Sequence, residues 1–153
     1  MTITAYEIDF YQWTQQQAAL MRQGEFNRVD LDIENIAEEI ESMGRRDRHA
    51  LRSYLHNILI HLLKWRYQPE RRGITWRLSI KNGRHQVDIL VEDSPSLQRK
   101  IPDLMAKEYA QARENAALET GLPLATFPEL CPFTVEQITG DGGRHHRSPV
   151  DGP

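Results

Sequence analysis

Apolar residues recur at helical spacing along nearly the whole chain, and no stretch shows the strict alternation that is typical of a strand. The pattern is strongest over residues 47–67. Its apolar positions cover more than half of the helix circumference: Leu51, Leu55, Ile58, Leu59, Ile60, Leu62, Leu63 and Trp65. A helix that is apolar over so much of its surface is buried by neighbours on several sides. The sequence therefore predicts an all-α fold with residues 47–67 as the central helix.

Capping and stop residues divide the rest of the pattern into further helices. Five helices are predicted, over residues 5–23, 31–43, 47–67, 75–92 and 95–120. The second carries an apolar stripe of Ile33, Ile36, Ile40 and Met43. Gly44 is expected to end or to kink that helix, because glycine costs about 1 kcal/mol inside a helix. Asn82-Gly83 weakens the middle of the fourth helix, and Pro102 is expected to kink or restart the fifth.

The C-terminal part of the chain has a different character. Residues 122–139 combine Pro123, Pro128 and Pro132 with buried-type apolar residues, which indicates short helical turns strapped onto the bundle. Residues 140–153 hold four glycines and two prolines, which predicts a flexible, disordered tail. The expected architecture is a compact five-helix bundle, one domain over residues 5–139, with a Pro-rich C-terminal strap and that tail.

Composition excludes several classes of protein. With one cysteine in 153 residues, the chain has no internal disulfide framework and no multi-cysteine metal site. No apolar run approaches the roughly 18–20 residues needed to span a bilayer. The opening residues MTITAYEIDF lack the basic and apolar regions of a signal peptide. We expect a soluble, cytoplasmic protein that does not enter a membrane.

Charge is distributed unevenly along the chain. Residues 1–44 carry nine acids and two bases, residues 45–85 carry eleven bases and two acids, and residues 86–153 carry eleven acids and six bases. One interpretation is that acidic and basic helices pack side by side and neutralise one another. The other is that the basic segment is a docking surface for phosphate or for an acidic partner.

Several strings occur in a distinctive order and spacing from about residue 6 to residue 138: residues 6–10, 36–45, 61–65, 67–72, 93–97 and 121–123, with Trp13, Trp76 and Phe127-Pro128. Together they resemble the domain-of-unknown-function 29 family, a bacterial family frequent in cyanobacteria. The resemblance implies an all-helical fold. It implies no activity.

Catalytic signatures are missing from the sequence. There is no Glu-x-x-His or His-Glu-x-x-His pattern, no Gly-x-Ser-x-Gly elbow and no Walker loop. We therefore predict no catalytic residue, no metal ligand and no cofactor, and the sequence leans away from an enzyme.

Six polar residues nevertheless fall on or beside apolar helix faces: Asp9, Gln17, Glu39, His61, Arg84 and Glu108. A polar group in a core costs several kcal/mol unless it is paired. One hypothesis is a structural network in which Glu108 or Glu39 pairs with Arg84 and His61 and so fixes the helix register. The alternative is a polar pocket with shifted pKa values, suited to an enzyme or to a metal.

A second candidate site is the turn between the third and fourth helices. Five basic or aromatic residues form the candidate surface, beside Trp65 and Trp76: Lys64, Tyr67, Arg71, Arg72 and Arg77. One interpretation is that Trp65 and Trp76 pack inward and clamp the turn, with Arg71 and Arg72 stacked on an aromatic face. Alternatively the arginines contact phosphates while Tyr67 stacks on a base.

Three classes of function follow from these features. The favoured one is a small intracellular protein-interaction or regulatory module with a protein partner, because charge is segregated and catalytic signatures are missing. The first alternative is a nucleic-acid-associated protein that uses residues 45–85. The second is an enzyme or metal-binding pocket inside the bundle.

Overall fold

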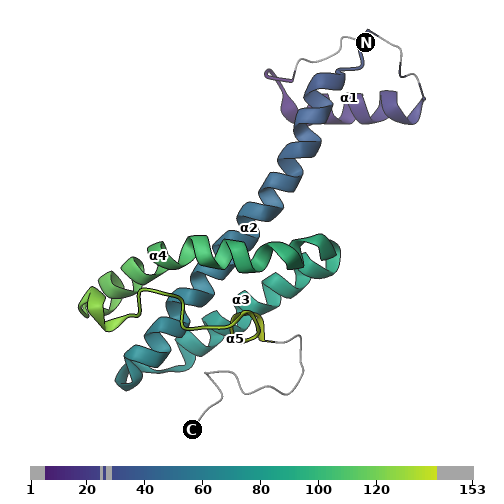
Figure 1. The fold of residues 1–153 in the computed structure, drawn as a ribbon. Helices are drawn as coiled ribbons and strands as arrows, with labels where there is room; N and C mark the ends of the chain where they lie inside the picture. The colour runs from purple at the N-terminus through teal and green to yellow at the C-terminus, as the bar shows by residue number, and fades with distance from the viewer. Residues whose placement is uncertain (1–5, 25, 27–28, 141–153) are drawn as a thin grey trace. The chain divides into compact units, whose positions relative to one another are not determined.

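The computed structural model describes residues 6–24, 26 and 29–140 (Figure 1). Of these residues 80% are helical, and no strand occurs among them. The all-α prediction is confirmed. The predicted tail beyond residue 140 lies outside the described residues.

The chain divides into two compact units, residues 1–46 and residues 47–153. Helix α2, Ile33–Tyr67, contributes its first part to one unit and its second part to the other. That residues 5–139 form one domain stays a prediction.

In the first unit, α1 runs from Phe10 to Arg22. Its N-cap is Asp9, whose carboxylate accepts from the backbone N–H of Gln12 at 2.9 Å. The helix therefore begins five residues later than predicted, because Asp9 satisfies the free backbone N–H groups at that point. The other predicted capping residue, Thr4, lies outside the described residues.

Helix α2 continues through Gly44, so the expectation that Gly44 ends a helix is wrong, and the expected kink stays a prediction. Ion pairs between side chains on either side of Gly44 favour the continuous helix. Arg45 contacts Glu38 at 2.6 Å and Glu41 at 3.7 Å, and Arg46 contacts Glu39 at 3.4 Å. Such pairs, four and seven residues apart on the same helix, offset part of the helix-propensity penalty of glycine.

The second unit is built around the second part of α2. Helices α3, Ile74–Asp93, and α4, Ile101–Thr120, join α2 in one core. The short 3-10 segment η1, Pro69–Arg71, follows α2, and η2, Pro95–Lys100, connects α3 to α4. Leu55, Ile58 and Leu62 are fully buried, as the central-helix prediction requires, whereas Trp65 is only partly buried.

Helix α3 is continuous through Asn82-Gly83, so the expected weak point does not break it. Gly83 is buried, and a Cβ added there would lie 2.7 Å from Cγ1 of Ile58. The missing side chain thus lets α3 approach α2 closely, and this packing offsets the poor helix propensity of glycine.

The predicted fifth helix is two elements. Residues 95–100 form η2, and α4 begins at Ile101 with Pro102 in its first turn, where the missing N–H of proline leaves no bond unmade. Pro102 therefore restarts the helix. At its other end, Gly121 adopts the left-handed conformation, with φ of 72°, and closes α4.

The strap contains η3, Leu124–Thr126, and α5, Val135–Thr139, which contacts α3. Phe127, Phe133 and Ile138 are buried in the core, so the strap prediction is confirmed. The Tyr109 hydroxyl of α4 donates to the Pro128 carbonyl and fastens the strap. Among the described residues α5 is thus the fifth helix, because the helices predicted over residues 31–43 and 47–67 form the single helix α2.

The two helical glycines should respond oppositely to alanine. Gly44→Ala meets no atom within 4 Å and should raise the free energy of unfolding by about 0.5–1 kcal/mol. Gly83→Ala should lower it by about 1–2 kcal/mol, because the clash with Ile58 outweighs the gain in propensity. Urea denaturation followed by circular dichroism measures both, and a stabilised Gly83→Ala would contradict the packing of α3 on α2.

Burial raises the pKa of Tyr109 to about 12, and this shift predicts an alkaline loss of stability. An unfolded tyrosine titrates near 10, so between about pH 10 and 12 the folded chain holds a proton that the unfolded chain has lost. The free energy of unfolding should therefore fall as pH rises through this window, by up to about 2–3 kcal/mol. Tyr109→Phe should show a shallower fall, and Tyr11→Phe, at an exposed position, the same fall as the unmodified chain. Identical slopes for all three proteins would contradict the prediction.

Candidate functional site

The first part of α2 carries large apolar side chains that the described residues do not bury. Ile33, Ile40 and Met43 are 61%, 61% and 60% exposed. We call these three residues the α2 stripe. Ile40 follows Ile33 by seven residues and Met43 follows Ile40 by three, so all three lie on one side of the helix. The sequence predicted the stripe but not its exposure; Ile36, the fourth predicted member, is half-buried.

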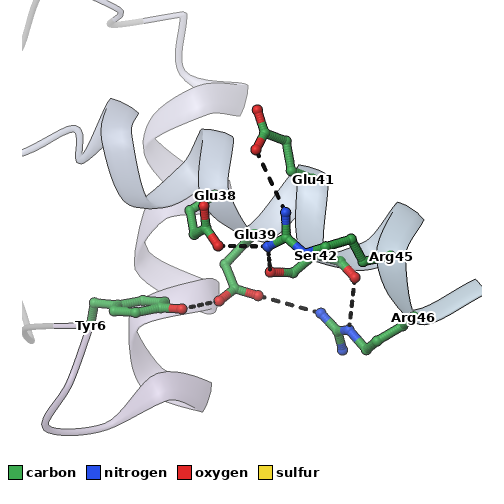
Figure 2. Close-up of polar contacts among 7 residues, drawn as sticks. All are labelled: Tyr6, Glu38, Glu39, Glu41, Ser42, Arg45 and Arg46. Carbon is green, nitrogen blue, oxygen red and sulfur yellow. Dashed lines mark hydrogen bonds and ion pairs between the residues drawn. The ribbon is translucent and has the colours of Figure 1, made fainter. Parts of the chain in front are cut away.

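A polar cluster occupies the neighbouring sides of the same helix (Figure 2). The Tyr6 hydroxyl donates to Glu39, whose other oxygen lies 3.4 Å from Arg46. The hydrogen bond to Glu39 raises the pKa of Tyr6, because ionisation would set two negative charges side by side. Arg45 donates to Glu38 and to the Ser42 hydroxyl, at 2.6 and 2.9 Å (Figure 2). These contacts join the segment before α1 to α2 and neutralise charges on adjacent turns.

Buried Gln17 ties α1 to the start of α2. Its side-chain amide donates to the Asp30 carbonyl at 3.1 Å and accepts from the Asp32 backbone N–H at 2.8 Å. The Asp32 carboxylate accepts from the indole N–H of Trp13 at 3.3 Å and from the Asn35 amide at 2.7 Å. The bond from Asn35, the largest cause, lowers the pKa of Asp32. The start of α2 is therefore held by side chains of α1 as well as by its own turn.

Glu108 is buried in the second unit, as its helical phase predicted, but its partners differ from the predicted Arg84 and His61. Arg52 Nε donates to one carboxylate oxygen, and His56 Nδ1 lies 3.0 Å from the other. The His56 Nε2 atom lies 3.1 Å from the Asn115 amide nitrogen. Because that amide donates to Nε2, His56 carries its proton on Nδ1 and donates to Glu108.

The other predicted network residues have partners of their own. His61 Nδ1 lies 2.8 Å from the Asn57 carbonyl on its own helix. Arg84 Nε donates to the Ile138 carbonyl at 3.3 Å, and its guanidinium also bonds Gln137, so it ties α5 to α3. Asp9 caps α1, Gln17 ties α1 to α2, and Glu39 bonds Tyr6 and Arg46. The contacts of each residue are structural ones at helix ends and between neighbouring helices.

Arg52 and His56 were missed because single-helix phase places them beside the apolar face of α2. Their side chains are 53% and 21% exposed. Their spacing of four residues puts them on one side of α2, and this signal could have marked them as partners for a carboxylate on the next helix.

In the basic and aromatic turn, cationic groups stack on aromatic rings of the chain. Lys64 Nζ lies 5.3 Å from the Trp76 ring centroid and 3.1 Å from Glu119. Arg72 lies 5.1 Å from the Trp65 ring and donates to the Trp65 carbonyl at 2.6 Å. Tyr67 packs edge-on against Phe127. Among the predicted surface residues, Arg71, Arg72 and Arg77 are exposed.

Within the part of the chain that the structure describes, no three His, Cys, Asp or Glu side chains are grouped so as to hold a metal ion. Burial raises the pKa of the half-buried Cys131 thiol, so it stays protonated at neutral pH. None of the described helices has the length and apolar character that crossing a membrane requires.

Comparison with known proteins finds one family. The model of a family described as "Domain of unknown function DUF29" matches residues 5–142. No curated protein and no solved structure matches the chain.

Removing the charge of Glu108 tests whether its cluster is structural. Glu108→Gln should lower the free energy of unfolding by about 1–2 kcal/mol, because Arg52 and His56 lose a buried carboxylate, and the half-exposed Arg52 is partly screened by solvent. Glu114→Gln, at an exposed position of the same helix, should leave stability unchanged. Urea midpoints measure both. A Glu108→Gln chain that is more stable would instead indicate a strained functional pocket.

Proposed function

Because the chain belongs to the family described as "Domain of unknown function DUF29", a description that specifies no activity, we propose its function from its own contacts. The chain is a protein-interaction module. Its α2 stripe binds an amphipathic helix of a protein partner.

The exposure of the α2 stripe carries this proposal. Burying one side chain of this size stabilises a contact by roughly 1.5–3 kcal/mol, so three of them supply a large driving force for association. Grouped exposed apolar residues are typical of interaction surfaces. Anchors that recur at helical spacing are the usual pattern when two helices pack together.

The contacts around the stripe support the same function. Gln17, Asp32 and Trp13 hold the start of α2, and the ion pairs across Gly44 support its continuation. A surface that is already ordered loses little conformational entropy when it binds. The stripe therefore suits binding without prior folding.

Charged side chains border the stripe on one side. Glu34, Glu41 and Arg45 each follow a stripe-side position, Ile33, Ile40 or Gly44, by one residue, which places them about 100° around the helix. A charged rim around an apolar centre selects among partners and excludes wrong ones.

The alternatives have less support. Lys64 of the predicted basic surface pairs with Glu119, which neutralises its charge, and Arg72 lies over the Trp65 ring. The Glu108 cluster offers one histidine and one carboxylate whose hydrogen bonds are directed at each other and at the neighbouring helix. A nucleic-acid role, an enzyme pocket and action in the cytoplasm of a bacterium stay predictions.

Photocrosslinking in cells tests the proposed function. A benzophenone amino acid at position 40 should give a covalent adduct with one defined protein, because Ile40 is in the middle of the stripe. The same amino acid at position 38, on the opposite side of α2, should give little or none. Adding Ile33→Ser and Met43→Ser should abolish the adduct at position 40. Equal yields at positions 40 and 38 would contradict the proposal.

A further inference from the structure

We propose that the helix that binds the α2 stripe is a basic one, with lysines or arginines along one edge of its own apolar side. This inference deepens the proposed function and rests on it, because it assumes that the stripe is a docking surface. The charges that border the stripe, and the way they are paired within the chain, favour a partner of this chemistry.

Small residues widen the apolar surface on one side of the stripe. Ala37 and Gly44 are exposed, and they lie about 40° and 20° around the helix from Ile33. A Cβ added at Gly44 would meet no atom within 4 Å. A second helix can therefore approach the α2 backbone closely on this side and reach the charged residues beyond it.

Two exposed glutamates form the edge of the apolar surface next to these small residues. Glu41 lies about 40° and Glu34 about 60° around α2 from Ala37, on the side away from Ile33. The two glutamates are seven residues apart, so they line one edge along the length of the stripe. The next position of this row is Arg48, which follows the stripe in the chain and belongs to the second unit.

The chain neutralises only part of this negative charge. An Arg45 nitrogen lies 2.6 Å from Glu38, whereas the nearest approach of Arg45 to Glu41 is 3.7 Å, close to the limit of an ion pair (Figure 2). Among the described residues, Glu34 has no ion-pair partner. One guanidinium thus serves Glu38 and Glu41 together, and Glu34 adds a further charge, so carboxylates are left in excess.

The other edge of the stripe supplies no free positive charge. Glu39 lies about 40° around the helix from Met43, and its carboxylate binds both the Tyr6 hydroxyl and Arg46. Residues 1–46 as a whole carry nine acids and four bases. A negative field of this kind speeds association with a basic partner and repels an acidic one.

Photocrosslinking in cells tests the charge of the partner. With the benzophenone amino acid at position 40, the double variant Glu34→Lys and Glu41→Lys should lower the adduct yield at least about fivefold, because it sets like charges against a basic helix. Asp103→Lys and Glu114→Lys together are the matched control, since they make the same charge change at two exposed positions of α4, and they should leave the yield unchanged. Circular dichroism checks that each purified chain is folded.

Two synthetic amphipathic helices of equal length test the same charges in solution. Both have leucines at helical spacing, and beside the leucines one carries lysines and the other glutamates. By fluorescence anisotropy the full chain should bind the lysine peptide at least about tenfold more tightly, and added salt should weaken this binding, because ions screen exposed charges. The chain with Glu34→Lys and Glu41→Lys should reverse the preference. A lysine peptide that binds the parent chain no more tightly than the glutamate peptide would overturn the inference.

The adduct at position 40 separates this inference from the proposed function. A cross-linked segment with lysines or arginines beside an apolar helix face supports both. An acidic segment, the α2 helix of a second copy, or a yield that the two lysine substitutions on α2 leave unchanged keeps the interaction module and overturns the basic partner. No adduct above the level at position 38 overturns both.

Discussion

The wide apolar face of α2 between Leu51 and Leu63 is the constraint on which the second unit depends. Its buried side chains point in too many directions for one neighbouring helix to cover. Helices α3 and α4 and the strap all contribute to the same core, and Gly83 lets α3 approach Ile58. The strap is therefore part of the fold, and Phe127 and Ile138 are as deeply buried as the residues of α2.

Local sequence patterns predicted the features that depend on a single helix. The width of the apolar face identified the central helix, and Gly121 closes α4 as a helix-stop signal predicts. Gly44 shows where such patterns fail. Glycine has a low helix propensity, but Glu38, Glu39 and Glu41 form ion pairs with arginines that follow Gly44 in the chain. Helix propensity describes one residue at a time and does not include such contacts between residues. Gly83 is a similar case, because its stabilising effect depends on close packing against Ile58 of another helix.

The features of the candidate site also divide into those that one helix is enough to predict and those that depend on a second helix. The phase of α4 was enough to predict that Glu108 is buried, since burial depends on the face of its own helix. Its partners depend on which helix lies opposite and in which register. Arg52 and His56 come from α2, 56 and 52 residues away in sequence, and no pattern within α4 contains that information. Pairing across helices is therefore the part of the site that one sequence leaves open.

The two parts of α2 show that the same helical spacing of apolar residues can give either a buried or an exposed apolar side. Both parts carry an apolar side, but in the second part that side is fully covered, whereas in the first Ile33, Ile40 and Met43 stay open to solvent. A folded domain is stable by only about 5–15 kcal/mol, so leaving three large apolar side chains exposed forgoes a substantial stabilisation. The polar contacts of Tyr6, Gln17 and Asp32 tie α2 to α1 and to the segment before it without using that side. The first unit also buries Trp13, Leu20 and Leu31, and neither these apolar contacts nor the polar ones cover Ile33, Ile40 and Met43.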